Sequence, residues 1–76
     1  MSVIVYTTNH CPECTILKKF LQDYQIEFVI RNCSQNPSFS EEINQLGFLG
    51  VPITLVNGKA IQGFKPHEII EALEAI

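Results

Sequence analysis

Two cysteines, Cys11 and Cys14, stand three positions apart in the segment CPEC. Such a pair can form a reversible disulfide, supply half of a metal site, or act as a permanent structural bridge. A structural bridge is the weaker interpretation, because a loop of so few residues constrains the unfolded chain little. Zinc is weaker still, since four ligands are normal and the chain has neither a second CxxC nor a closely spaced Cys/His pair. The spacing favours redox chemistry and leaves the other two interpretations open.

Pro12 suits the first position of a helix, which makes Cys11 the N-cap and places Cys14 one turn away. The unpaired amides and the positive end of the helix dipole favour an anion, so the pKa of the Cys11 thiol should fall from about 8.5 toward roughly 3.5–7.5. Cys11 is then the expected nucleophile, and Cys14 the resolving thiol that attacks the mixed disulfide. Glu13 should moderate the fall in pKa, and His10 would assist only when protonated.

The composition limits the kind of protein. The chain has 76 residues, 46% of them hydrophobic and 17% charged, which is typical of a single folded domain over residues 1–76. The net charge is -3 and the Lys and Arg residues are scattered, so the sequence shows no basic cluster that would bind the phosphates of nucleic acid. The apolar run Val3–Tyr6 is too short for a signal peptide, and three cysteines are few for a secreted mini-protein. We expect a cytoplasmic monomer with no nucleic-acid or membrane partner.

The elements that must position the cysteines follow from the hydrophobic pattern. The continuous run Val3–Tyr6 predicts a central strand covered on both faces. From Pro12 onward, apolar residues recur at helical spacing and predict one buried face: Ile16, Leu17, Phe20, Leu21 and Tyr24. An apolar strand over residues 26–30 follows, and a strand, helix and strand in succession imply a parallel crossover. Ser38–Glu41 form an S-x-x-E capping box for a short second helix, which Gly47 ends.

The last third of the chain predicts a hairpin and a third helix. Asn57 and Gly58 are the strongest two-residue hairpin signal, and they separate the strands Ile53–Val56 and Lys59–Gln62. Pro66 suits the start of the last helix, whose apolar stripe is Ile69, Ile70, Leu73 and Ile76. The predicted order of elements is βαβαββα.

With these features, the chain resembles the glutaredoxin family, and within it the NrdH-type redoxins. The resemblance rests on VIVYTTNHCPEC at residues 3–14, GFLGVP at residues 47–52 and GFKP at residues 63–66. It implies a thioredoxin fold of the α/β class, with a four-stranded mixed sheet between helices and a cis peptide before Pro52 that faces the CxxC. It also implies a small thiol–disulfide oxidoreductase with no bound cofactor, only the redox-active Cys11–Cys14 disulfide.

The resemblance implies two alternative reductants. Glutaredoxins that use glutathione commonly carry a lysine where this chain has Thr8, a threonine where it has Gly50, and a second glycine and an acidic residue where it has Phe64 and Lys65. NrdH-type redoxins take electrons from thioredoxin reductase, which uses NADPH, and feed a ribonucleotide reductase. The chain differs from them at residues 61–62, where Ile-Gln replaces Trp-Ser. Thioredoxin reductase or glutathione is therefore the expected reductant, and a protein disulfide, ribonucleotide reductase among the targets, the expected substrate.

A substrate groove around the cysteines is the last expectation. Its expected residues are Thr8, His10, Pro12, Val51, Pro52, Gly63, Phe64 and Lys65. The backbone at Val51 and Pro52 could pair with an extended substrate, although proline is also an ordinary strand start. Phe64 fits the core as well as a groove wall, Lys65 fits a solvated surface, and Cys33 is expected to be a small apolar residue. The alternative from another class is a non-catalytic, redox-sensing adaptor that binds a partner in the same groove.

Overall fold

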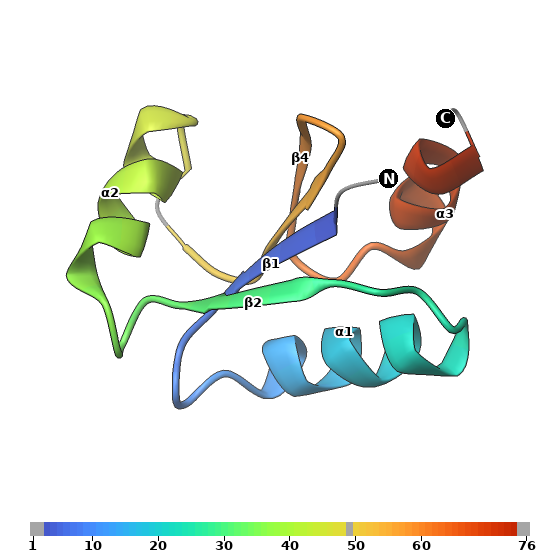
Figure 1. Ribbon diagram of the computed structural model, residues 1–76, viewed down its shortest axis with the longest axis horizontal. Helices are drawn as coiled ribbons and strands as arrows, with labels where there is room; N and C mark the ends of the chain where they lie inside the picture. Colours follow the sequence, from blue (N-terminus) through green and yellow to red (C-terminus); the bar gives the residue numbers. More distant parts are fainter. Residues whose placement is uncertain (1–2, 49, 75–76) are drawn as a thin grey trace.

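The computed structural model describes residues 3–48 and 50–74. Its elements follow the predicted βαβαββα order (Figure 1): β1 (Val3–Thr7), α1 (Pro12–Asp23), β2 (Val29–Asn32), α2 (Pro37–Gln45), β3 (Ile53–Val56), β4 (Lys59–Gln62) and α3 (Pro66–Glu74). Leu49 of the GFLGVP segment and Ile76 of the predicted last helix lie outside the described residues. None of the helices in the described ranges is long and apolar enough to cross a membrane.

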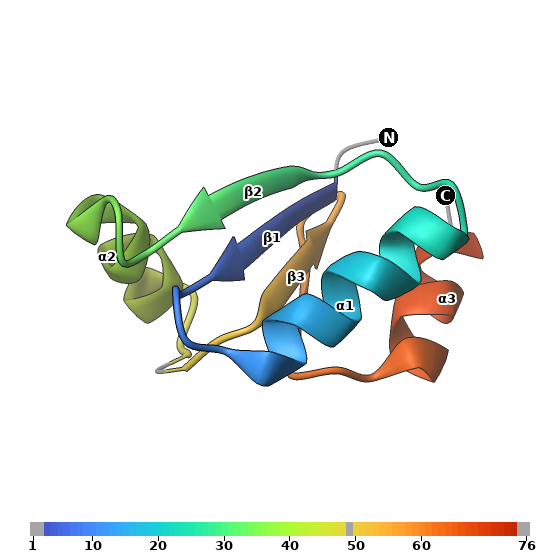
Figure 2. The ribbon, with the colours of Figure 1, turned by 90° about the horizontal axis from the view of Figure 1, so that it is seen from below.

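The four strands form one mixed sheet in the order β2-β1-β3-β4 (Figure 2). β1 runs parallel to β2, with Val5 opposite Ile30, and antiparallel to β3, with Val5 opposite Thr54. The prediction of a central first strand is therefore confirmed. Asn57 and Gly58 join β3 to β4 with φ values of 48° and 93°, the left-handed backbone that a type I′ hairpin turn requires. This topology brings the end of β1, where the CxxC loop begins, beside the start of β3.

Helices cover both faces of the sheet. α1 and α3 pack on one face, and α2 lies on the other face, near the end of the sheet where β1 and β2 finish (Figures 1 and 2). Side chains alternate along β1, so Val3 and Val5 face α1 while Tyr6 faces α2. The buried core under α1 and α3 consists of Val3, Val5, Leu17, Leu21, Val56, Ile61, Ile69 and Ala72. The smaller core under α2 consists of Tyr6, Cys33, Ile43 and Ile53.

The buried face of α1 is narrower than predicted. Its buried side chains are Cys14, Leu17 and Leu21, which follow one another at spacings of three and four residues. Ile16 is 51% exposed and Tyr24 is 57% exposed, so their inclusion in the predicted face was wrong. One residue along a helix is a rotation of about 100°, which turns Ile16 away from the line of Leu17.

The second strand begins later than predicted, at Val29 rather than near Ile26. Ile26 and Phe28 are partly buried against the core under α1 before the strand starts. Val29 and Ile30 are 58% and 40% exposed, because β2 is an edge strand. A run of apolar residues alone does not distinguish an edge strand from a covered one.

The start of α2 also differs from the prediction. The N-cap is Asn36 rather than Ser38, and the Asn36 side chain accepts a hydrogen bond from the Ser38 backbone N–H at 3.1 Å. Pro37 follows at the first helical position, where its missing N–H costs nothing. The predicted end of the helix at a glycine is confirmed, because Gly47 has a φ of 95°. The Gly47 N–H donates a hydrogen bond to the Asn44 carbonyl, and the Phe48 N–H donates one to the Ile43 carbonyl. These two bonds form a Schellman motif.

Candidate active site

The amino end of α1 has the geometry that the CPEC segment predicts. Cys11 is the N-cap, with extended backbone angles of -132° and 98°, and Pro12 begins the helix. The Cys14 backbone N–H donates a hydrogen bond to the Cys11 sulfur at 3.1 Å. The sulfur therefore takes the place of the side-chain oxygen that usually caps a helix. One of the free amides of the first turn thus points at the Cys11 Sγ atom.

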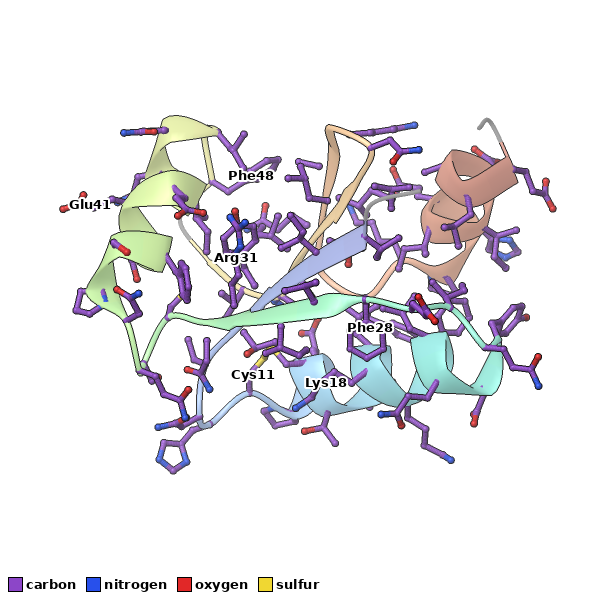
Figure 3. The ribbon with its side chains drawn as sticks, in the orientation of Figure 1. Cys11, Lys18, Phe28, Arg31, Glu41 and Phe48 are labelled. Atoms are coloured by element: carbon purple, nitrogen blue, oxygen red, sulfur yellow. A yellow bond between two sulfur atoms is a disulfide. The ribbon has the colours of Figure 1, made fainter. Side chains whose placement is uncertain are left out.

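Cys11 and Cys14 are joined in a disulfide, with their Cα atoms 5.2 Å apart. Figure 3 shows this bond at the amino end of α1, between the helix and the strands. Cys14 is only 1% exposed, whereas Cys11 is partly exposed. A reactant that approaches from outside therefore reaches the Cys11 sulfur and not the Cys14 sulfur. In residues 3–48 and 50–74, no three His, Cys, Asp or Glu side chains are grouped to hold a metal ion.

Three separate segments meet at this end of the sheet. The peptide before Pro52 is cis, as the family resemblance implies. The Gly63 N–H donates to the Pro52 carbonyl at 2.8 Å, which joins the start of β3 to the loop after β4. A Cβ built on Gly63, which has a φ of 80°, would lie 3.8 Å from Glu13 Oε2. The CPEC turn, the Val51–Pro52 peptide and Gly63 are therefore neighbours.

The remaining predicted groove residues differ in their surroundings. His10 and Pro12 are exposed beside the disulfide, and Thr8 is partly buried at the end of β1. Phe64 packs against the core under α1, with its ring edge-on to Phe20 at a centroid distance of 5.6 Å. The Lys65 ammonium lies 3.6 Å from Glu68 Oε2 in an exposed ion pair. Phe64 is therefore mainly a core residue, and Lys65 is paired with a residue in the first turn of α3, the helix that follows it.

A cavity of about 130 Å³ lies on the α2 side of the site. Its lining residues are Thr8, Cys33, Ser40, Ile43, Asn44, Gly50 and Val51. Thr8 and Val51 were predicted as groove residues, whereas the three residues from α2 were not. The spacing of residues 40, 43 and 44 shows that they share one face of a helix, but only the fold shows that this face lies beside Val51. Cys33 is buried in the small core, as predicted.

A hydrogen-bonded cluster fixes α2 to the sheet next to this cavity. Glu42 Oε1 accepts from the Tyr6 hydroxyl at 2.7 Å and from Arg31 at 2.6 Å, and Arg31 also donates to the Tyr6 oxygen at 3.0 Å. The hydrogen bond from Tyr6, and then that from Arg31, hold the pKa of Glu42 below its usual 4.5. Burial, and then the bond to Glu42, raise the pKa of Tyr6 above 10.0. In Figure 3 Arg31 lies between the strands and α2. No sequence motif predicts this cluster, because its three residues come from β1, β2 and α2.

A thioredoxin fold with a CxxC disulfide at the amino end of its first helix defines a class of small thiol–disulfide redox proteins. Within that class, the chain belongs to the glutaredoxin family, because the sequence model of that family, described as Glutaredoxin, matches residues 3–61.

Individual relatives place it near the NrdH-type members. The chain is 34% identical over 67 residues to the glutaredoxin-like protein NrdH of Lactococcus lactis, an alignment that covers 88% of this chain and 93% of the relative. It is 34% identical over 71 residues to a glutaredoxin-like 8.6 kDa protein in the rubredoxin operon of Clostridium pasteurianum, with 92% and 95% covered. The solved structure of NrdH-redoxin from Escherichia coli superposes with a TM-score of 0.87 at 25% identity, covering 93% of both chains.

Proposed function

We propose that this protein is a dithiol electron carrier that reduces disulfides in other proteins. The observation that carries the proposal is the asymmetry of the two sulfurs. Cys11 is accessible and accepts a backbone N–H, whereas Cys14 is buried one turn behind it. Family membership supports thiol–disulfide exchange in general. The roles of the individual residues are our proposal.

The proposed cycle begins with both cysteines reduced. The Cys11 thiolate attacks one sulfur of the target disulfide, which forms a Cys11–target disulfide and releases the other target sulfur as a thiolate. Cys14 then loses its proton and attacks the Cys11 sulfur. This step forms the Cys11–Cys14 disulfide and releases the second target sulfur, so two electrons have passed to the target. A reductase must then return two electrons to the pair.

The helix end assists the first step and the last. The Cys14 N–H and the positive end of the α1 dipole stabilise negative charge on Cys11 Sγ, both when it attacks and when it leaves. Cys14 is buried, so its sulfur can react only with a sulfur that is already attached to Cys11. The order of the two attacks therefore follows from the geometry of the helix start.

The target would bind as an extended segment along Val51. Among the described residues, no hydrogen bond to the Val51 backbone is found. A peptide could pair with this backbone as in β-strand addition, at the end of the sheet where β3 begins rather than along the outer edges formed by β2 and β4. Pro52, Gly63 and the exposed side chains of His10 and Pro12 would then lie around the reacting sulfurs.

We further propose thioredoxin reductase, supplied by NADPH, as the reductant. Glutathione carries two carboxylates, which need cationic or N–H partners. Thr8 replaces the lysine of glutathione-using relatives, and Lys65 is already paired with Glu68. The Escherichia coli relative is described as a glutaredoxin-like protein with a thioredoxin-like activity profile, which supports this choice. A cytoplasmic ribonucleotide reductase is the target that we propose from the NrdH-type relatives.

A coupled assay tests the reductant. The protein is mixed with insulin and NADPH, and either thioredoxin reductase or glutathione with glutathione reductase is added. We expect NADPH oxidation with thioredoxin reductase and little with the glutathione pair. Turnover with glutathione alone would assign the protein to the glutathione-dependent glutaredoxins.

Single-cysteine variants test the two roles. Cys14→Ser should form a mixed disulfide with insulin that persists, because no second thiol resolves it, and Cys11→Ser should form none. The products are identified by intact mass under non-reducing conditions. Equal residual activity in both variants would contradict the assignment. Partner binding that survives loss of both cysteines, without turnover in the intact protein, would favour the adaptor instead.

A further inference from the structure

The cavity beside α2 is not used by the cycle described above, although it adjoins the residues that the cycle uses. Thr8, at its wall, is three residues before Cys11, and Val51 is the residue whose backbone would pair with the target. The opposite wall comes from α2, through Ser40, Ile43 and Asn44. A target segment paired with Val51 therefore passes the mouth of this cavity while its cysteine lies at Cys11.

Alternation along an extended peptide makes this contact specific. Successive side chains of a strand point to opposite sides, so only some positions of a paired target face α2. Val51 itself is partly buried and lines the cavity, which places the cavity on one side of the pairing backbone. One side chain close to the target cysteine would enter it.

The chemistry of the lining selects against charge. All of the described lining residues are uncharged, and they mix hydroxyl and amide groups with apolar surface. Arg31 and Glu42, on β2 and α2, are already joined by a 2.6 Å contact and by bonds to Tyr6. A charged side chain that entered would lose hydration without gaining an oppositely charged partner, which is costly.

The volume sets the size of the side chain. The cavity holds about 130 Å³, and an enclosed cavity of about 150 Å³ accepts a benzene ring. Alanine would leave most of this space empty. Leucine or a side chain of similar size would fill it and contact Ile43 and Val51.

We propose that this cavity is the specificity pocket of the protein, and that it receives one uncharged, medium-sized side chain located within two residues of the reacting cysteine of a target peptide. The proposal rests on the proposed function, because it assumes that Cys11 attacks a peptide disulfide.

The test uses five-residue peptides with a central cysteine bonded to thionitrobenzoate. Attack by Cys11 on the peptide sulfur forms the Cys11–peptide disulfide and releases coloured thionitrobenzoate, so the rate is read directly. Leucine, alanine, glutamate and lysine are placed in turn at each of the four flanking positions, with alanine elsewhere. At one position we expect leucine to react at least about tenfold faster than alanine, since single methylenes in a pocket already give such factors.

Peptides with glutamate or lysine distinguish the effect of the pocket on the rate from the effect of the protein's overall charge. With a net charge of -3, long-range attraction favours lysine and disfavours glutamate. An uncharged pocket disfavours both, so both should be slower than leucine at the selective position and remain so in high salt, which screens long-range effects.

Two variants of α2 locate the effect. Asn44→Trp should fill the pocket and abolish the preference for leucine, whereas the control Gln45→Trp, on the same helix but outside the lining, should keep it. Asn44→Lys should raise the rate of the glutamate peptide relative to the lysine peptide by roughly twofold to fivefold, the range of a partly exposed ion pair.

The outcomes are distinguishable. Equal rates for leucine, alanine, glutamate and lysine at all four positions, or an unchanged preference in Asn44→Trp, would overturn the pocket and leave the electron carrier intact. Absence of thionitrobenzoate release from every peptide would instead overturn the proposed function.

Discussion

At the scale of single residues, the two cysteines differ although they are bonded to each other. Cys11 accepts an N–H from the helix that it caps, and Cys14 is closed off between α1 and the sheet. One helix start therefore provides both a stabilised, accessible sulfur and a protected partner one turn away. Neither a third cysteine nor a metal ion is needed for this division of roles.

Thr54 is a buried residue whose hydroxyl is unsatisfied. Its oxygen has no hydrogen-bond partner among the described residues, and its neighbours across the sheet, Val5 and Ile61, belong to the apolar core under α1. Thr54→Val keeps the shape and removes the buried hydroxyl. We expect the free energy of unfolding in urea to rise by about 1 kcal/mol. A decrease of that size would show that the hydroxyl stabilises the fold.

The position of the two cysteines at the start of α1 could be predicted from sequence because the signal is local. The CPEC segment contains both cysteines and the proline that starts the helix, so the N-cap position of Cys11 can be predicted from these four residues alone. The cavity residues Ser40 and Asn44 could not be found in this way. They meet Thr8 and Val51 only after α2 has crossed to the far face of the sheet.

At the scale of elements, α2 is fixed to the sheet by few apolar side chains and by one polar cluster. Ile43 is its only buried residue among those described, and Glu42 binds Tyr6 from β1 and Arg31 from β2. Arg31 also lies 5.7 Å from the ring centres of both Tyr6 and Phe39. This cluster therefore holds the wall of the proposed pocket in place.

The lowered pKa of Glu42 gives this cluster a pH dependence. The pKa of Glu42 in the folded protein is below its unfolded value of 4.5. The ionised Glu42 carboxylate therefore contributes its full stabilisation above pH 4.5, and this stabilisation is lost as the pH falls through the folded pKa. Wild type should therefore be more stable than Glu42→Gln at pH 7, and the difference should shrink below about pH 4.5. Thermal unfolding at several pH values measures the difference.

Glu41→Gln is the matched control, since Glu41 is the exposed neighbour on the same helix. It should change stability little at either pH. A difference between wild type and Glu42→Gln that is the same at pH 3 and pH 7 would contradict the role of the Glu42 carboxylate.

Element boundaries were less predictable than element types. Ser38–Glu41 matches a capping box, but Asn36 followed by Pro37 is an equally valid start two residues earlier, and in the structure it is the one used. The exposure of Val29 depends on the position of β2 at the sheet edge, which sequence pattern alone does not report. Glycine and proline signals, by contrast, act locally, so Gly47 and the Asn57–Gly58 turn were predicted correctly.

At the scale of the whole molecule, the sheet leaves two open edges, and both are protected. β2 and β4 have four residues each, and each carries a basic residue, Arg31 and Lys59. Short, charged edges discourage pairing between copies. We therefore expect light scattering to give a mass near 8.6 kDa in both redox states. A stable mass of twice this value would show that the exposed Val29 and Ile30 form an interface.

The central claim is that the helix start makes Cys11 the reactive thiolate. The most direct test reacts the reduced protein with a limiting amount of iodoacetamide over a range of pH and locates the label by peptide mass. We expect Cys11 to be labelled first, at a rate that follows a pKa below the ordinary value of about 8.5. Labelling of Cys14 first, or a Cys11 rate that rises only at or above about pH 8.5, would contradict the account.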